Sequence, residues 1–299
     1  MTRPFLKMPR PFLKMPRPFL KMPRPFLKMN GLGNDFIVVD ARDTAFTPAL
    51  AQIRAWGDRA SGIGFDQLIS IEGSASGDAF MRVWNNDGGT VETCGNALRC
   101  VAWYLNQDAS DKTLKIDTLG GLTKARVLRA DAKTGTASVD MGKPGLDWKQ
   151  IPLAEEMNTL NLELQVGPID APLYHTPVAV SMGNPHVVFF VPDVNRVDVA
   201  ATGSLIENHP LFPEGVNVEF AQILDRQTIR MRVWERGAGI TLACGTGACA
   251  TLVAAARRGL TDRSATVIMD GGPLHISWAE NDHVIMTGPI EVEFSGELS

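Results

Sequence analysis

The sequence lacks the features of several classes of protein. No apolar run approaches the ~20 residues that a membrane-spanning helix needs, and the start shows no signal peptide, so we expect a cytoplasmic protein without a membrane partner. Hydrophobic residues make up 44% of the 299 positions and charged residues 21%. This balance is typical of a globular protein with a full core, and the length allows two domains.

Basic residues are scarce outside the first thirty positions. Residues 1–30 hold eight Lys and Arg and no acidic residue, whereas the rest holds 21 basic and 33 acidic residues. The overall net charge of −4 is therefore the sum of +8 for residues 1–30 and −12 for the rest of the chain. Nucleic-acid binding depends on clustered Lys and Arg, so we expect no nucleic-acid partner.

Cysteines are also few: Cys94, Cys100, Cys244 and Cys249. A disulfide framework is typical of small secreted domains rather than of a chain of this length. The spacings of six and five residues, with no histidine between, do not match the close pairs of a structural zinc site. We expect reduced thiols and no metal.

A repeat dominates the start of the chain. RPFLKMN at 24–30 is preceded by three copies of RPFLKMP, at 3–9, 10–16 and 17–23. A proline in every unit removes a helical hydrogen bond, so neither a coiled coil nor a helical transit peptide fits. We interpret residues 1–23 as a loosely ordered tandem duplication and expect the last copy to serve as the first strand.

The rest of the chain alternates between strand and helix patterns. Helical spacing predicts helices at 47–60, 95–105 and 245–258. Apolar or alternating runs predict strands at 36–40, 65–72, 78–85, 114–119, 123–130, 136–142, 186–191, 216–224, 228–235, 266–272, 274–280 and 283–294.

One stretch occurs twice. MRVWNNDGGTVETCGN (81–96) and MRVWERGAGITLACGT (231–246) align without a gap at a distance of 150 residues, and seven of sixteen positions are identical. Each copy runs through a glycine-containing loop to a cysteine and a Gly-led helix. We infer two similar halves that face each other, with the Pro- and Gly-rich segment 141–152 at their boundary.

The repeated cysteines, Cys94 and Cys244, stand at the two helix starts. Unpaired N–H groups and the helix dipole favour negative charge there, so a thiol pKa near 8.5 is expected to fall toward ~7. If the halves close, one thiolate can take a proton from a carbon while the opposed thiol delivers one to its far face. This pair of proton transfers inverts a stereocentre without a cofactor, provided the helix N–H groups stabilise the developing charge on a substrate carboxylate.

A single Cys-Gly pair could merely cap a helix, with the cysteine packing as a small apolar residue. Two such pairs at the same position of a repeat favour a catalytic role for both cysteines instead. Cys100 and Cys249 lie inside the helices and do not align with each other, so we expect them to be buried packing residues.

Six motifs carry a resemblance to a known family. The chain resembles the diaminopimelate epimerases through GLGNDF (31–36), GFDQ (64–67), NNDGGTVETCGN (85–96), MGNPH (182–186), GVN (215–217) and ERGAGITLACGTGA (235–248). The resemblance implies a cofactor-independent isomerase that interconverts LL- and meso-2,6-diaminopimelate, on the route to lysine and peptidoglycan precursors, and it implies a homodimer.

The resemblance also implies the fold. We expect an α/β (α+β) protein of two pseudo-symmetric halves, each a mostly antiparallel or mixed sheet wrapped around a central helix, with the active site in the cleft between them. The halves would be 24–141, joined by a return strand at 289–299, and 142–288.

Residue roles follow by motif. The resemblance makes Cys94 and Cys244 the base and acid pair, with His186 and Glu235 tuning their thiols. The N–H groups of Gly95, Asn96, Gly245 and Thr246 would bind the carboxylate at the reacting carbon. The rest of the pocket would be Asn34, Gln67, Asn85, Asn184, Asn217, Glu235 and Arg236. The planar fork of an arginine suits a carboxylate, and amides suit a zwitterion because they add no net charge.

Several of these residues have structural interpretations as well. Asn34 and Asn184 are typical turn residues, His186 could be a satisfied core histidine, and Glu235 with Arg236 could be an exposed ion pair. The position of that last pair in the duplicated loop favours function.

The chain departs from the family pattern at four places. Asn30 stands where the family has histidine, Ala97–Leu98 replaces Gly-Ala, Ile240 replaces glutamate, and Thr246 replaces serine. None of these removes a catalytic group, although Leu98 adds bulk beside a helix start.

Three other functions compete. A proline or hydroxyproline racemase would share the fold but bind a compact substrate. A thiol hydrolase would need a histidine base beside one cysteine and would leave the second copy unexplained. A redox or binding protein would join Cys94 to Cys244 in a disulfide.

Overall fold

The computed structural model describes residues 23–108 and 112–298. The last repeat copy forms the first strand, β1 (Arg24–Asn30), as predicted. The prediction about the earlier copies falls almost wholly outside the described residues.

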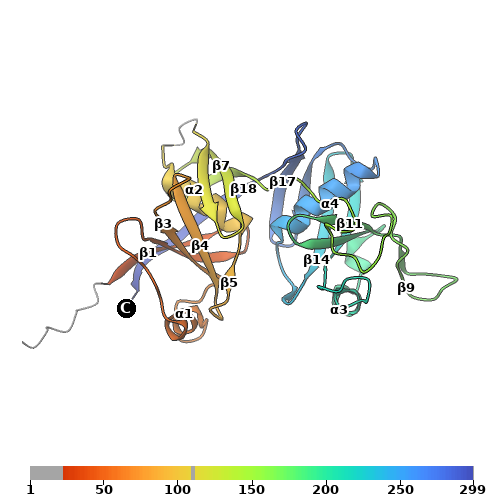
Figure 1. The fold of residues 1–299 in the computed structure, drawn as a ribbon, viewed down its shortest axis with the longest axis horizontal. Coiled ribbons are helices and arrows are strands. Elements are labelled where there is room, and N and C mark those ends of the chain that lie inside the picture. The colour runs from red at the N-terminus through yellow and green to blue at the C-terminus, as the bar shows by residue number, and fades with distance from the viewer. Residues whose placement is uncertain (1–22, 109–111, 299) are drawn as a thin grey trace, which may run out of the picture.

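The first part of the chain forms a lobe around one central helix, α2 (Figure 1). We call it the α2 lobe. Its further elements are β2 (Asp35–Asp40), α1 (Leu50–Gly57), β3 (Gln67–Glu72), β4 (Ala79–Asn85), β5 (Thr90–Val91), α2 (Gly95–Leu105), β6 (Leu114–Thr118), β7 (Gly121–Ala130) and β8 (Thr134–Asp140).

The second part forms the α4 lobe around helix α4. Its elements are β9 (Gln165–Val166), β10 (Tyr174–His175), β11 (Val178–Ser181), β12 (Pro185–Phe190), the 3-10 helix η1 (Val194–Arg196), α3 (Val199–Glu207), β13 (Asn217–Asp225), β14 (Thr228–Glu235), β15 (Gly239–Ile240), α4 (Gly245–Arg257), β16 (Ser264–Met269) and β17 (Gly272–Trp278).

The last strand, β18 (Val284–Leu298), belongs to both lobes. Its first residues pair with β17, its middle with β8 and its end with β1. The pairing with β1 closes a ring, β1-β2-β3-β4-β6-β7-β8-β18, around α2, and the sheet continues from β18 through β17, β16, β14, β13 and β12 to β11. This confirms the predicted fold class of two halves, each with a mixed sheet around a central helix, and β18 joins the two into one continuous sheet.

Both central helices are buried almost all round, as a helix enclosed by a sheet must be. Eight residues of α2 and nine of α4 are buried, and each helix packs in a separate hydrophobic cluster with its own sheet. The outer faces of the two sheets carry further clusters, one beside α1 and one beside α3. The lobes therefore repeat the same layers.

The register of the strands extends the duplication beyond the repeated stretch. β2 pairs in parallel with β3, with Phe36 opposite Gln67. β12 pairs in parallel with β13, with His186 opposite Asn217. Both pairs obey the same 150-residue offset as the cysteines, so equivalent positions can be compared residue by residue.

The sequence patterns predicted most elements correctly but missed several. Helix α3 was missed because VAATGSLIE has a central Thr-Gly and little polar contrast between its faces. The predicted helix at 47–60 is shorter, at Leu50–Gly57. Strands β5, β9, β10, β11 and β15 were also missed, and four of these contain only two residues.

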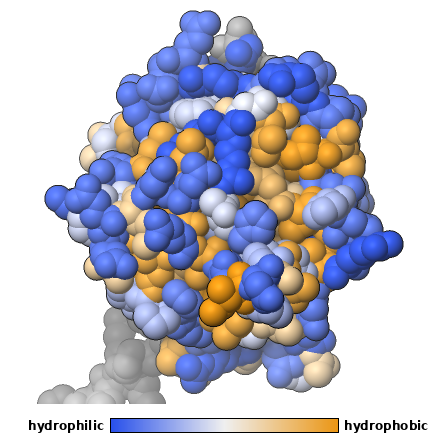
Figure 2. Space-filling model, turned by 90° about the vertical axis from the view of Figure 1, so that its right-hand side faces the viewer, coloured by the Kyte–Doolittle hydropathy of each residue, from blue (hydrophilic) through white to orange (hydrophobic). Residues whose placement is uncertain are grey.

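The outer end of the α4 lobe has hydrophobic side chains scattered among hydrophilic ones (Figure 2). The hairpin that contains β9 and β10 projects from this end (Figure 1). Between its strands Ile169 and Leu173 are exposed. No helix in the described ranges is long and apolar enough to cross a membrane.

Candidate functional site

The starts of the two central helices lie against each other. The side chain of Met286, on β18, contacts both: a Cβ added at Gly95 would be 2.7 Å from its Cε, and one added at Gly245 would be 3.0 Å from its Sδ. The Asn96 Oδ1 would be 3.2 Å from the same added Cβ of Gly245. Glycine at both positions allows this close approach, so Cys94-Gly95 and Cys244-Gly245 converge at the junction of the lobes.

Cys94 is the N-cap residue of α2 and is partly buried. Its Sγ lies 3.9 Å from Asn34 Oδ1, and the Asn34 amide nitrogen donates to Asp66 Oδ2 at 2.7 Å. Asn34 follows the Gly31–Gly33 turn, in which Leu32 has a φ of 70°. Asn34 is therefore more than a turn residue, because its side chain joins the turn to the thiol.

Cys244 is the N-cap residue of α4 and is buried, at 4% exposure. Its Sγ accepts a hydrogen bond from the Gly247 N–H at 3.3 Å and lies 3.6 Å from Thr246 Oγ1. Asn184 donates to the same hydroxyl at 3.4 Å. The second thiol is thus held by the first turn of its helix and by a side chain from the neighbouring loop.

The expected lowering of the thiol pKa values is wrong for this structure. Burial raises the pKa of the Cys94 thiol, and the first-turn N–H groups of α2 offset this only in part. Burial raises the pKa of Cys244 well above its usual range, and the charges of Glu235 and Glu219 raise it further. Removing a thiolate from water outweighs the helix start here, because desolvation acts against the charged form.

His186 and Glu219 form a buried pair beside the second thiol. Both are 0% exposed, and His186 Nδ1 lies 2.6 Å from Glu219 Oε1. The other ring nitrogen lies 3.0 Å from Asn184 Oδ1. A line of polar contacts therefore runs from Glu219 through His186, Asn184 and Thr246 to the Cys244 sulfur.

Glu235 ends strand β14 and Arg236 follows it, and these two side chains do not form an ion pair with each other. Glu235 accepts a hydrogen bond from Thr241 Oγ1, and its charge raises the pKa of both repeated cysteines. The Arg236 guanidinium donates to Glu214 O at 2.8 Å, and its N–H donates to Asn217 Oδ1 at 3.0 Å. The Asn217 amide nitrogen also donates to the Pro185 carbonyl. Asn217 therefore fixes the backbone at Arg236, next to Glu235.

Gln67 and Asn85 face each other across β3 and β4. The Gln67 amide nitrogen donates to Asn85 Oδ1 at 3.1 Å, whereas the Gln67 Oε1 is buried without a hydrogen-bond partner. A buried acceptor left unpaired is unfavourable. It therefore marks a place where a donor group of a ligand, such as an ammonium, can bind.

At the 150-residue offset the predicted pocket residues form equivalent pairs. Asn34 matches Asn184, Gln67 matches Asn217 and Asn85 matches Glu235, in the same way that Cys94 matches Cys244. The two lobes thus present polar side chains at equivalent positions, mostly amides, with one carboxylate in the α4 lobe.

One of the four departures from the family pattern, Thr246, contacts a thiol, since its hydroxyl lies 3.6 Å from the Cys244 sulfur. Asn30 shapes the turn before Asn34, because its Oδ1 accepts from the Gly33 N–H at 2.7 Å. Leu98 is fully buried in the core of the α2 lobe, so its bulk fills that core. Ile240 is 47% exposed.

Two residues at the site were not predicted. Glu219 had a signal, since it is a carboxylate inside the apolar strand VNVEF. Arg99 also had a sequence signal, since it is the only charged residue of the helix Gly95–Leu105. In the structure it is fully buried. Cys100 and Cys249 are both fully buried, as predicted, and all four cysteines are free thiols.

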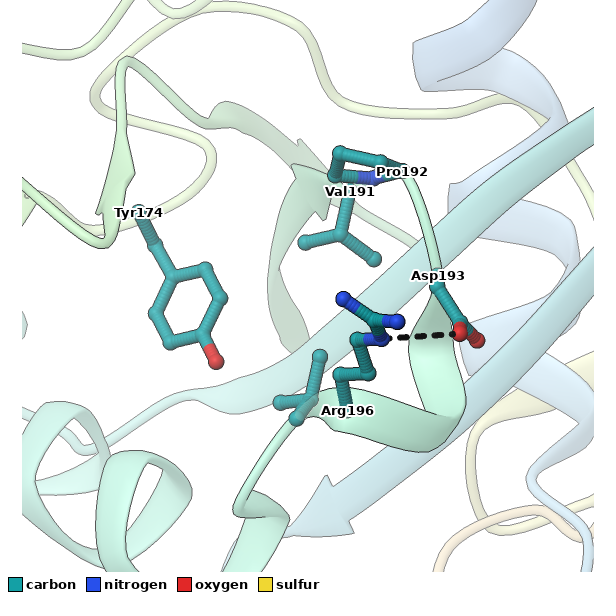
Figure 3. Close-up of a pocket in the computed structure, with 6 residues that line it drawn as sticks. Tyr174, Val191, Pro192, Asp193 and Arg196 are labelled. Carbon is teal, nitrogen blue, oxygen red and sulfur yellow. Dashed lines mark ion pairs between the residues drawn. The ribbon is translucent and has the colours of Figure 1, made fainter.

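A surface hollow elsewhere does not compete with this site. It lies on the α4 lobe and is lined by Tyr174, Val191, Pro192, Asp193, Arg196 and Val197 (Figure 3). Its only ion pair joins Arg196 to Asp193 at 3.6 Å. It contains neither repeated cysteine and no residue of the six motifs. The described residues also contain no group of three or more side chains placed to hold a metal ion.

Solved structures with the same architecture include enzymes that invert stereocentres. A hydroxyproline epimerase from Agrobacterium vitis matches with a TM-score of 0.64, over 93% of this chain and 93% of that chain, at 14% identity. At that identity the match shows the fold alone. The molecule therefore has the two-lobed fold of this class of epimerases.

Sequence comparison places the chain within that class. A diaminopimelate epimerase from Caulobacter vibrioides is 58% identical over 279 residues, covering 90% of this chain and 96% of the relative. One from Caulobacter sp. strain K31 is 54% identical over 280 residues, with the same coverages. The family model for diaminopimelate epimerase matches residues 26–146 and 178–293. The chain belongs to the diaminopimelate epimerase family, and it is an isomerase.

Proposed function

We propose that this enzyme interconverts LL- and meso-2,6-diaminopimelate by proton transfer between Cys94, Cys244 and the α-carbon, without pyridoxal phosphate. The observation that carries the proposal is the convergence of two Cys-Gly helix starts on Met286. Membership of the family supports the substrate, which is the one named for the relatives.

The proposed reaction needs one thiolate and one thiol. The thiolate takes the α-proton, and the electrons of the broken C–H bond delocalise into the neighbouring carboxylate. The opposite S–H then delivers its proton to the other face of the carbon, so each turnover exchanges which sulfur is protonated. In this proposal N–H groups at the starts of α2 and α4 stabilise the charge on the carboxylate.

The remaining pocket residues would bind the rest of the substrate. In this proposal Gln67 Oε1, which is buried and unpaired, accepts a hydrogen bond from an ammonium group, and the Arg236 guanidinium pairs with the distal carboxylate. Amides from both lobes bind the remainder: Asn34, Asn85, Asn184 and Asn217. His186 acts on Cys244 through Asn184 and Thr246 rather than directly.

The proposal extends to the organisation of the protein. The two halves would be 24–141 with the return strand 289–299, and 142–288; the pairing of β18 with both β8 and β1 supports this division. The enzyme would serve lysine and peptidoglycan precursor biosynthesis in the cytoplasm as a homodimer. Light scattering behind a sizing column tests the dimer, and a monomer mass would contradict it.

Solvent exchange tests the reaction. The enzyme is incubated with LL-diaminopimelate in deuterated water, and deuterium at the α-carbon is followed by NMR as meso product appears. We expect one deuterium at the inverted centre and none at the other. L-Proline and trans-4-hydroxyproline serve as comparison substrates: their inversion, without that of diaminopimelate, would support the racemase alternative instead.

A thiol hydrolase is disfavoured by the same geometry. Within the described ranges no histidine hydrogen-bonds to either repeated cysteine, and His186 reaches Cys244 only through two intervening side chains. A hydrolase would release product without deuterium on carbon, so the exchange experiment distinguishes the two.

A further inference from the structure

Two equivalent asparagines are held in opposite orientations. Asn34 and Asn184 stand 150 residues apart, and each directly precedes a strand, β2 or β12. In the α2 lobe the amide oxygen of Asn34 faces the site, 3.9 Å from the Cys94 sulfur. In the α4 lobe the amide nitrogen of Asn184 faces the helix start, 3.4 Å from Thr246 Oγ1. One lobe therefore presents a hydrogen-bond acceptor where the other presents a donor.

A carboxylate holds Asn34. Asp66 Oδ2 accepts hydrogen bonds from Asn34 Nδ2 at 2.7 Å and from the Asp35 N–H at 3.1 Å. The other oxygen of Asp66 forms an ion pair with Arg59 at 2.7 Å. An ionised carboxylate only accepts hydrogen bonds. It therefore binds the nitrogen of the Asn34 amide and leaves the oxygen turned toward Cys94.

A buried histidine holds Asn184. His186 Nε2 lies 3.0 Å from Asn184 Oδ1, and its Nδ1 lies 2.6 Å from Glu219 Oε1. His186 and Glu219 are both 0% exposed, and among the described residues Glu219 Oε2 has no hydrogen-bond partner.

The protons of this pair determine the orientation of Asn184. A lone negative charge in a fully buried place is costly, so His186 and Glu219 together hold two protons. One is shared between Nδ1 and Oε1, and the other is on Nε2. The direction of the Glu219 pKa agrees, because burial raises it. The Nε2–H donates to the oxygen of the Asn184 amide and leaves the nitrogen turned toward the start of α4.

Each lobe lacks the polar groups that hold the asparagine of the other. At the 150-residue offset a fully buried apolar residue stands in place of each one: Val216 matches Asp66, Phe36 matches His186, and Ile69 matches Glu219. The opposite orientations therefore come from different residues in the two lobes and not from the shared asparagine.

We propose that Asp66 and the His186–Glu219 pair are positioning residues. They fix the two amides so that Asn34 accepts a hydrogen bond from an ammonium group of the ligand and Asn184 donates one to a carboxylate. The inference rests on the proposed function, in which the ligand carries both groups.

Two other side chains agree with this polarity. In the α2 lobe Gln67 Oε1 is a second acceptor, buried and without a hydrogen-bond partner among the described residues. In the α4 lobe the guanidinium of Arg236, which directly follows β14, can only donate.

Two simple ligands separate the ammonium from the carboxylate. Pimelate has both carboxylates of diaminopimelate and no ammonium, whereas cadaverine has both ammonium groups and no carboxylate. Ligand-observed NMR gives the dissociation constant of each with the free enzyme, and the readout is the ratio of the constant for pimelate to that for cadaverine. General loosening of the site weakens both ligands and leaves this ratio in place. Both should bind the unmodified enzyme, and failure of either would overturn the proposal.

Variants of Asp66 test the α2 lobe. The side chain is 40% exposed, so both variants should fold. Asp66→Val frees the Asn34 nitrogen, whereas Asp66→Asn removes the same charge but keeps an oxygen that accepts from it. We expect the ratio for Asp66→Val to be about tenfold lower than for Asp66→Asn, as expected for one hydrogen bond to a charged group. Equal ratios in the two variants would overturn the role of Asp66.

A double variant tests the α4 lobe. His186→Phe with Glu219→Ile installs the residues of the α2 lobe, and apolar replacement of a buried pair preserves stability. It replaces a pair of zero net charge with neutral residues, so the total charge stays the same. Asn184 is then free to turn its oxygen to the ligand, which should weaken pimelate and raise the ratio about tenfold. An unchanged ratio in the folded double variant would overturn the role of the pair.

NMR of the unmodified enzyme tests the protons directly. The histidine rings are labelled with ¹⁵N, and His186 is the only one of the five that is fully buried, so slow exchange of its ring proton identifies it. We expect Nε2 to carry a proton from pH 6 to 9. An Nε2 without a proton would bind the Asn184 nitrogen instead and overturn the assignment. This measurement also decides the α4 lobe if the double variant does not fold.

The outcome separates this inference from the proposed function, because the probes bind without reacting. Shifted ratios with no turnover of diaminopimelate would retain the orientation of the amides and reject the epimerase. Turnover with unshifted ratios would retain the epimerase and reject the positioning role.

Discussion

The two lobes are equivalent in layout and different in charge. Where the α2 lobe has Phe36 and Ile69, both fully buried, the α4 lobe has His186 and Glu219, also fully buried, at the same offset of 150 residues. Where the α4 helix has Cys249, the α2 helix has Arg99. Duplication thus supplied two similar helix starts, and a few buried substitutions made their surroundings unequal. The proposed two-base reaction does not itself need this inequality, because even identical neighbouring thiols lose their protons one at a time.

The largest expected effect comes from removing either sulfur. Cys94→Ala and Cys244→Ala should each lower epimerisation by about 10³-fold or more, since each removes one of two proton-transfer groups. Both variants should stay folded, because each replacement removes only one sulfur atom and keeps the Cβ. Polarimetry or the deuterium assay measures the rate, and circular dichroism controls for folding. Normal epimerisation by either variant would contradict the two-base mechanism.

A double-mutant cycle at the buried pair gives the next largest effect. His186→Phe alone should destabilise the protein by about 3 kcal/mol, because it leaves Glu219 as an uncompensated buried carboxylate. The double replacement His186→Phe with Glu219→Ile installs the residues of the α2 lobe and should be neutral or stabilising by about 1–4 kcal/mol. Urea unfolding measures both, and additive effects would contradict coupling between the two residues.

That single variant should also respond to pH in a defined direction. Burial raises the pKa of Glu219 above 4.5 in the folded state, so the folded state binds the proton more tightly than the unfolded one. The Glu219 carboxyl therefore does not lower the free energy of unfolding below about pH 4, and it lowers it increasingly as the pH rises through the folded pKa. The loss caused by His186→Phe should accordingly be smaller at pH 4 than at pH 7.

An effect confined to alkaline pH concerns the two inner cysteines. Burial raises the pKa of Cys100 and of Cys249 from 9.0 to about 12. Between these values the unfolded chain releases protons that the folded chain keeps, so stability falls as the pH rises, by about 1.4 kcal/mol per pH unit for each thiol. Replacing both with alanine should remove their share of the slope and leave that of Cys94 and Cys244, whose pKa values burial also raises. Urea titrations between pH 8.5 and 10.5 measure it, and an unchanged slope would contradict the burial effect.

The smallest effect is expected at the start of the chain. Deleting residues 3–23 leaves β1 with its partners β2 and β18, so kcat/KM and the thermal midpoint should remain unchanged. Calorimetry and the exchange assay compare the two proteins. Lost turnover in the shortened protein would show that the repeat has a function.

Local patterns and the repeat predicted much of this molecule. The helix bounds at Gly95–Leu105 and the strand bounds at Thr228–Glu235 agree with the sequence pattern because short-range periodicity and a leading glycine determine them. The strand pairings across the ring were not predictable in this way. Helix α3 was missed because its stability comes from the outer core that it covers rather than from its own pattern.

The sequence by itself determined that two Cys-Gly helix starts exist and that similar residues precede them, since an internal repeat can be seen in the sequence alone. Only the tertiary structure decided their chemistry. Burial reversed the expected direction of both thiol pKa values, and a parallel pairing brought His186 and Glu219 together from 33 positions apart. Desolvation and charge act through space, and the distance between two groups in space is set by the closed sheet rather than by their order along the chain.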